Sequence, residues 1–116
     1  MTLNELSRAA HSAAVAKGFY ERERGFPELA MLVVTEIAEA VEADRNNEWT
    51  PCSPPCDGLE PDTFETLYKD TVEDEIADIF IRLFDLCGFY GIDIDGHVAA
   101  KMAYNATRPP KHGKAY

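Results

Sequence analysis

The chain has 116 residues, a length that suits one compact domain and leaves little room for a second. Hydrophobic residues make up 46% of it, which is enough for one core and argues against a fully disordered chain. The net charge of -10 argues against a protein that wraps nucleic acid, because phosphate binding draws on clustered lysine and arginine. We therefore expect a single domain over residues 1–116 that binds no nucleic acid.

The N-terminal residues give no sign of a targeting segment. Glu5, Arg8 and His11 interrupt the apolar residues there, so the stretch lacks the unbroken apolar run of a signal peptide. No part of the chain approaches the roughly 18 apolar residues that a membrane-spanning helix needs. The sequence thus predicts a cytoplasmic protein with no membrane partner.

The first half of the chain predicts two helices. Residues 3–17 are rich in helix formers and end at Gly18, a residue suited to closing a helix. After an aromatic and charged connection, Pro27 suits the first turn of a second helix over residues 28–45.

Residues 46–70 are expected to form an irregular insertion, because prolines, asparagines and a glycine recur along them. A short helical piece near residues 64–69 is the only regular element expected there. Cys52 and Cys56 form half of a zinc site at most, since no second cysteine pair exists to complete it. We favour reduced thiols, in keeping with the odd number of cysteines.

The second half predicts two more helices. The third begins after Thr71, a suitable N-cap, and ends at residue 86 or 90, near Gly88 and Gly91. The fourth, capped by Asp95, covers residues 96–106 and stops before a proline pair. Since no segment shows convincing strand alternation, the predicted fold is all-α with four helices.

Residues 107–116 form a basic C-terminal tail. No acid occurs from residue 97 onward, whereas four lysines and arginines do. An acidic body with a basic tail suits a protein that binds metal in one place and phosphate in another. A solvated terminus explains the same charges equally well.

The second helix carries a carboxylate in an unusual position. Leu29, Val33 and Ala40 form one apolar stripe, and Glu36 falls inside it, with Glu39 about one turn away. A buried carboxylate is costly unless a metal ion or an arginine neutralises it.

The third helix offers a matching pair. Glu75 lies at the edge of its apolar face and Asp78 follows three residues later. Two such helices packed side by side would form a cluster of four carboxylates, which suits Mg²⁺ or Mn²⁺ because these ions prefer oxygen ligands. The competing interpretation is that these acids are ordinary surface groups, with Asp78 paired to Arg82 four residues on.

These residues together resemble a known family. Glu36-x-x-Glu39 in LVVTEIAEAVEADR and Glu75-x-x-Asp78 in VEDEIADIFIRLFDLCGFYGIDI look like the acidic motifs of the MazG-like all-α nucleoside triphosphate pyrophosphohydrolases. The segments KGFYERERGFPE and KMAYNATRPPKHGKAY are also similar to that family. The resemblance covers nearly the whole chain except residues 46–70, which make the gap between the two acidic motifs longer than usual.

The resemblance implies a helical bundle completed by formation of a dimer or tetramer. It implies hydrolysis of a nucleoside triphosphate between the α and β phosphates, giving a monophosphate and pyrophosphate. It also implies residue roles. The metal-binding acids would be Glu36, Glu39, Glu75 and Asp78, with Glu36 and Glu39 also catalytic and Glu39 acting on the attacking water. Phosphate or sugar would contact Lys101, Asn105, Arg108 and Lys111.

Two points stay open at this stage. Trp49 is a candidate for stacking on the base, with Phe19, Tyr20 and Phe26 as alternatives, although an aromatic residue is more often packed in a core or a subunit interface. Three alternatives to the main interpretation also remain: a related substrate such as phosphoribosyl-ATP, dUTP or dCTP, a non-catalytic helical module that binds a nucleotide or a partner, and a zinc-dependent regulator.

Overall fold

The computed structural model of the protein describes residues 1–110, and in this part of the chain the all-α prediction is confirmed, with five helices and no strand. The helices are α1 (Leu3–Ala16), α2 (Phe26–Arg45), α3 (Pro61–Leu67), α4 (Val72–Tyr90) and α5 (Ile94–Ala106). Four of them correspond to the predicted helices. The remaining helix, α3, is the short piece expected in the insertion, although it begins at Pro61 and not near residue 64. None of the helices in residues 1–110 has the length and apolar character needed to cross a membrane.

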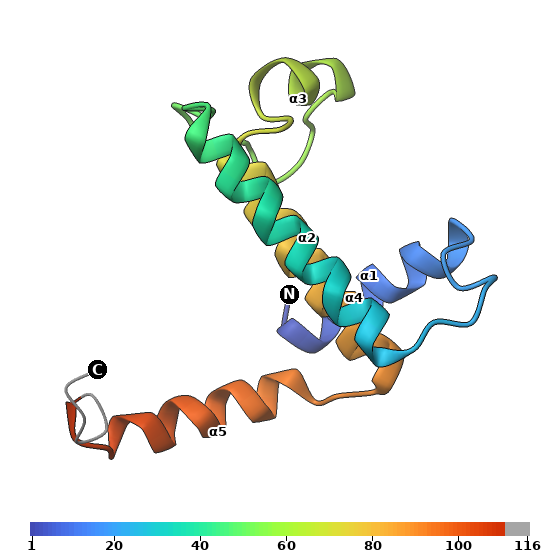
Figure 1. The fold of residues 1–116 in the computed structure, drawn as a ribbon, viewed down its shortest axis with the longest axis vertical. Helices are drawn as coiled ribbons and strands as arrows, with labels where there is room; N and C mark the ends of the chain where they lie inside the picture. The colour runs from blue at the N-terminus through green and yellow to red at the C-terminus, as the bar shows by residue number, and fades with distance from the viewer. Residues whose placement is uncertain (111–116) are drawn as a thin grey trace.

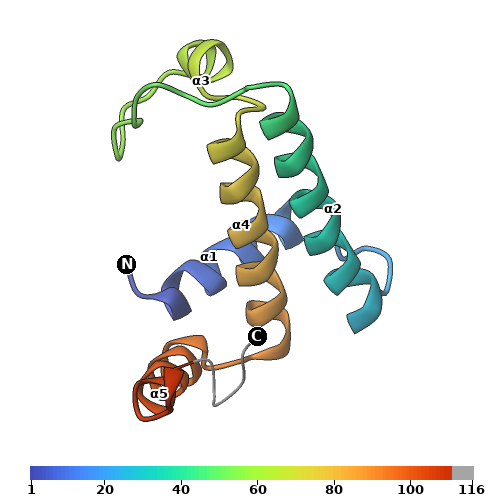
Figure 2. The same cartoon turned by 60° about the vertical axis from the view of Figure 1, so that its left-hand side comes forward.

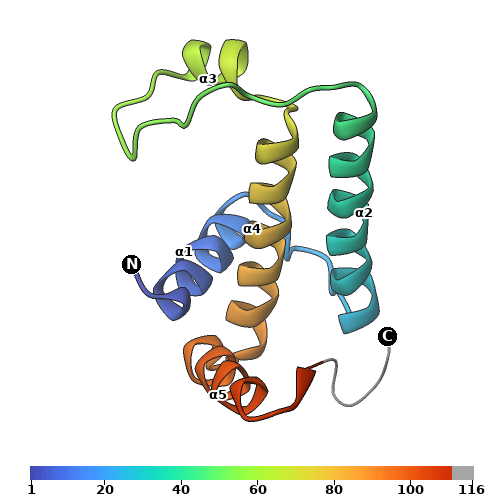
Figure 3. The ribbon, with the colours of Figure 1, turned by 90° about the vertical axis from the view of Figure 1, so that its left-hand side faces the viewer.

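Helix α4 is central, and both α1 and α2 pack against it. In Figure 2 and Figure 3, α2 and α4 lie side by side and antiparallel, while α1 crosses α4 at a steep angle. The apolar stripe predicted on α2 accounts for part of this contact, because Leu29 and Val33 are buried. The buried apolar side chains are Leu29, Val33, Ala43, Tyr68, Val72, Leu86 and Cys87.

The crossing of α1 over α4 depends on a glycine. A Cβ atom at Gly88 would lie 2.6 Å from the backbone oxygen of Ser7 and 2.7 Å from Cβ of His11. Gly88 therefore lies inside α4 as a point of close approach, and the prediction that it marks the end of the helix is wrong. Gly91 alone ends α4, with a φ of 65° in the left-handed region.

A polar network fastens the same crossing. The carboxylate of Asp85 is buried, lies 2.9 Å from Nδ1 of His11 and accepts a hydrogen bond of 2.8 Å from the hydroxyl of Tyr20. The Tyr20 ring stacks on Phe89, with centroids 4.8 Å apart. Burial and the bond to Asp85 raise the pKa of Tyr20, so its hydroxyl keeps its proton and remains a donor.

The cap of α5 differs from expectation, and the acid predicted to form it contacts the start of α1 instead. Asp93, not the predicted Asp95, caps α5, and it accepts a hydrogen bond from the backbone of Gly96 at 3.1 Å. Asp95 instead accepts from the backbone nitrogens of Leu3 and Asn4 at 3.1 and 3.0 Å, at the start of α1. Acids at a helix start satisfy free N–H groups, and here one acid satisfies those of another helix. The hydrogen bonds of Asp95 to the start of α1 hold α5 beside the N-terminal end of α1 (Figure 1).

The insertion is attached to the start of α4. The backbone nitrogen of Val72 donates to the oxygen of Glu48 at 2.8 Å, and the backbone nitrogen of Thr50 donates to the carboxylate of Glu73. Tyr68, just after α3, is buried. This attachment places residues 50–54 against the first turns of α4.

Candidate metal centre

Three of the four predicted metal-binding acids come together where α2 and α4 lie side by side. Glu36, Glu75 and Asp78 each offer a carboxylate oxygen, and these atoms all lie within 4.8 Å of one another. Glu36 and Glu75 are 8% and 7% exposed, and Asp78 is half-buried. The Glu-x-x-Glu and Glu-x-x-Asp spacings explain the arrangement, because residues three apart share one side of a helix.

Glu39 lies at the edge of this group rather than inside it. It is exposed, and with Glu75 it lines a pocket of about 170 Å³ between the end of α2 and the start of α4. The remaining residues lining this pocket are Glu42, Ala43, Glu48 and Asp70. The sequence does not predict this concentration of acids, because Glu42 belongs to the predicted second helix and Glu48 to the predicted insertion.

One acid of the group has a basic partner. Nε of Arg82 lies 3.1 Å from Oε1 of Glu36 and donates a hydrogen bond to it. The pairing of Arg82 with Asp78, which the competing interpretation predicted, is not among the ion pairs of the described residues. In the described residues no ion pair involves Glu39, Glu75 or Asp78, although the positive charge of Arg82 partly offsets the acids around Asp78.

Glu75 is the acid whose pKa is most affected by this arrangement. Burial, with the neighbouring carboxylates of Glu39 and Asp78, raises the pKa of Glu75 to about 7. Burial and the carboxylates of Asp74 and Glu36 also raise the pKa of Asp78. One oxygen of Glu75, Oε2, is buried without a hydrogen-bond partner among residues 1–110.

A divalent cation fits these residues. Carboxylate oxygens are the ligands that Mg²⁺ and Mn²⁺ prefer, and a cation would neutralise acids that the protein itself leaves unpaired. It would also give the orphaned oxygen of Glu75 a partner. Glu36, Glu75 and Asp78 would hold the ion, with Glu39 at the edge. A second group of close oxygens, from Asp70, Asp74 and Glu75, adjoins this one.

A pocket of about 520 Å³, which we call the α1 pocket, opens beside the acids. Glu36 and Asp78 form part of its wall, and two cations, Lys17 and Arg82, line it as well. Its other lining residues are Ala10, Ala13, Ala14, Gly18, Phe19, Ile81 and Asp85. Phe19 is one of the aromatic residues considered for base stacking, but Lys17 is not predicted from the sequence, because nothing in a linear pattern indicates that the end of α1 lies near Glu36.

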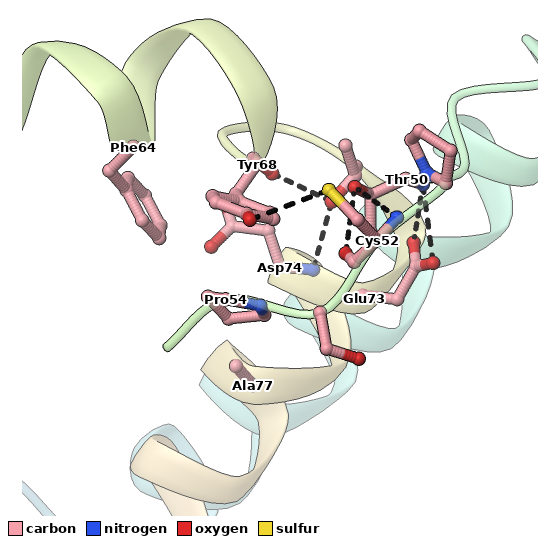
Figure 4. Close-up of a pocket in the computed structure, with 11 residues that line it drawn as sticks. Thr50, Cys52, Pro54, Phe64, Tyr68, Glu73, Asp74 and Ala77 are labelled. Atoms are coloured by element: carbon pink, nitrogen blue, oxygen red, sulfur yellow. Dashed lines mark hydrogen bonds between the residues drawn. The ribbon is translucent and has the colours of Figure 1, made fainter. Parts of the chain in front are cut away.

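A separate pocket, the insertion pocket, lies over the first turns of α4 and has a volume of about 440 Å³ (Figure 4). It is lined by Thr50, Pro51, Cys52, Ser53, Pro54, Phe64, Tyr68, Thr71, Glu73, Asp74 and Ala77. Cys52 contributes its sulfur to this wall, 3.5 Å from the hydroxyl oxygen of Tyr68. Neither Cys52 nor Cys56 belongs to a group of possible metal ligands in the described residues.

The predicted substrate-binding residues lie away from the acids of their own chain. Lys101 and Arg108 flank the ring of Tyr104 at 5.1 and 5.4 Å, and Lys101 and Asn105 belong to α5. Helix α5 follows the opposite end of α4 (Figure 3). Asp78 precedes Tyr90, the last residue of α4, by about 18 Å along the helix, at a rise of about 1.5 Å per residue. Lys111 lies outside the described residues.

Trp49 is also not beside the acidic group. It is 55% exposed, and its indole nitrogen donates to Asp44 at 3.1 Å, near the end of α2. It lines none of the three pockets described above. Its assignment to base stacking stays a prediction.

Comparison of the chain with protein families, curated proteins and solved structures finds no match.

Proposed function

We propose that this chain is a MazG-like, magnesium-dependent nucleotide pyrophosphohydrolase, which cleaves nucleoside triphosphates between the α and β phosphates. The products are a nucleoside monophosphate and pyrophosphate. This activity would serve to remove unwanted nucleotides from the nucleotide pool. One observation carries the proposal: Glu36, Glu75 and Asp78 place three oxygens within 4.8 Å of one another, and two of these acids are buried. Burial of carboxylates is costly, and a bound cation is the simplest way to offset that cost.

The roles of the side chains follow from their positions. A bound divalent cation supplies neutralisation of phosphate charge and a lowered pKa for water. Glu39 is exposed beside Glu75, so it is the acid placed to orient the attacking water and take its proton. Lys17 and Arg82 line the pocket next to Glu36 and Asp78, where they would bind phosphate oxygens and stabilise the charge on departing pyrophosphate.

We propose that the protein forms a homo-oligomer, because a single chain is less compact than expected for its length. Its radius of gyration is 16.9 Å, against about 13 Å for a compact chain of this length. Met31, Val34 and Val41 on α2 and Phe80 on α4 are about half exposed. Apolar side chains exposed along two neighbouring helices are typical of a subunit interface. A second copy would also supply Lys101, Asn105 and Arg108 of its α5 to the acids of the first.

Light scattering tests the oligomer. We expect a mass of at least twice the 12.9 kDa of one chain, and the double variant Val34→Glu, Phe80→Glu should shift it towards one chain, because charges in an apolar interface are costly. Val15→Glu is the matched control, since Val15 is exposed on α1 and does not belong to the proposed interface on α2 and α4. A wild-type mass of 12.9 kDa would contradict the interface.

A nucleotide panel tests the activity. Ribo- and deoxyribonucleoside triphosphates, with phosphoribosyl-ATP, are incubated with the protein and Mg²⁺ or Mn²⁺, and pyrophosphate is measured. We expect release of pyrophosphate, not phosphate, from at least one of them, and none when the metal is chelated. Absence of release from the whole panel would contradict the proposal.

The ion pair between Glu36 and Arg82 favours a second candidate, a non-catalytic helical module that binds a nucleotide or a partner. In that case the acids serve structure. Isothermal titration with Mg²⁺ distinguishes the two, because the module predicts no specific binding of the ion, whereas the enzyme predicts binding that Glu36→Gln weakens.

A further inference from the structure

The insertion pocket differs from the α1 pocket in its charge. The α1 pocket has Lys17 and Arg82 in its wall. Among residues 1–110 no lysine or arginine lines the insertion pocket, but the carboxylates of Glu73 and Asp74 do. The α1 pocket also contains the acids Glu36, Asp78 and Asp85, but it offers a triphosphate chain two positively charged side chains, whereas the described lining of the insertion pocket offers none. An uncharged part of a ligand is therefore what the insertion pocket can take.

The shape of the insertion pocket suits a flat ring. Phe64 and Tyr68 face into it from the end of α3, and Pro54 and Ala77 close it from the other side (Figure 4). The two aromatic rings have centroids 6.0 Å apart and are tilted by 42°. Aromatic side chains bind nucleobases by stacking, which tolerates any base. The volume of about 440 Å³ lies in the range of small-molecule sites.

Asp74 supplies the hydrogen-bonding group of the pocket. Its Oδ2 accepts a hydrogen bond of 2.9 Å from the backbone nitrogen of Asp70, while its Oδ1 has no partner among residues 1–110. Both oxygens of Glu73 already accept from the backbone nitrogen of Thr50, at 3.1 and 3.2 Å. The free oxygen of Asp74 is an acceptor, so a ring that contacts it needs a donor there, while the Ser53 hydroxyl in the same lining can donate or accept.

Asp74 also connects this pocket to the metal centre. A carboxylate oxygen of Asp74 lies within 4.8 Å of one of Glu75, and Glu75 in turn lies within that distance of Glu36 and Asp78. A ring held against Asp74 is therefore next to the place where the phosphates would be held.

We propose that the insertion pocket binds the nucleobase of the substrate and selects bases that carry an exocyclic amino group, with Asp74 accepting from that group. Uracil and thymine present an oxygen at the same position and would meet the carboxylate as a second acceptor. The inference rests on the proposed hydrolysis of nucleotides. It gives residues 46–70, which interrupt the acidic motifs, a role in choosing the substrate.

Asp74→Asn tests the choice of base with little risk to the fold, because the amide oxygen still accepts from Asp70. We expect kcat/KM for dCTP to fall about tenfold, since a hydrogen bond to a charged group is lost, while dUTP changes less than about threefold or improves. Asp57→Asn, exposed elsewhere in the insertion, is the matched control and should change neither. Phe64→Ala should raise KM for both substrates.

A binding experiment separates this inference from the catalytic proposal. Isothermal titration of the metal-free protein with CMP and UMP is expected to show tighter binding of CMP, and Asp74→Asn should remove the difference. If no triphosphate is cleaved but this difference is found, the hydrolase proposal fails and the base pocket stands. If triphosphates are cleaved but Asp74→Asn leaves the ratio of dCTP to dUTP unchanged, the base pocket fails. A change in that ratio caused instead by Ala14→Leu, in the α1 pocket, would overturn it too.

Discussion

Replacing Glu75 by glutamine is expected to lower pyrophosphate release by about 10²- to 10³-fold, the effect of removing one preorganised electrostatic group from an active site. Glutamine keeps the size of the side chain but removes the charge that would hold a cation. Glu75 is the best single choice because it belongs to both groups of close oxygens and its Oε2 has no partner in residues 1–110.

The same substitution is expected to leave the fold intact. The buried carboxylate is costly in the metal-free protein, so its neutral replacement should unfold at the same or a higher temperature. Glu65→Gln is the matched control, because Glu65 is exposed on α3, and it should behave as the wild type. If Glu75→Gln instead destabilises the protein and activity falls only with the folded fraction, Glu75 is a structural acid.

The stability of the metal-free protein is expected to fall as the pH rises from about 4.5 to above 7. Glu75 has its pKa raised from 4.5 to about 7 in the folded state, mainly by burial and then by Glu39. The folded state therefore binds a proton that the unfolded chain has released. This contribution is fully present below pH 4.5 and is lost as the pH passes through 7. A shift of this size corresponds to about 3 kcal/mol at most.

Unfolding by urea at a series of pH values measures this effect, and the comparison with Glu75→Gln isolates it from other titrating groups. As the pH rises, the unfolding free energy of the variant should increase relative to that of the wild type. At pH 8, Mg²⁺ should restore the stability of the wild type. A difference that does not vary between pH 5 and 8 would show that Glu75 titrates normally in the folded state.

The helices were predictable because their determinants are local. Pro27 in the first turn of α2 and Thr71 as the cap of α4 both act within one turn of the chain, and the structure confirms them. The approach of Glu36 to Glu75 and Asp78 could also be predicted from the sequence. Helical periodicity places each acid on one side of its helix, and only the side-by-side packing had to be assumed.

What the sequence could not decide depends on contacts between distant segments. Asp95 was taken for the cap of α5 because it precedes a helical segment, yet it satisfies the start of α1, over ninety positions away. The i,i+4 spacing allowed Arg82 to pair with Asp78, as in the competing interpretation, but in the folded chain Arg82 binds Glu36 on another helix. In each case a local partner was available and a distant one took its place.

The helical class and the one-turn spacing of acids on two amphipathic helices can be derived from the amino-acid sequence, because both properties follow from periodicity along one element. The packing of the folded chain sets which acids are buried, which of them has an arginine partner, and how the Pro-rich insertion lies over α4 beside Asp74. Burial and pairing depend on the distance between side chains of different elements, and that distance is set by packing such as the close approach of α1 to Gly88.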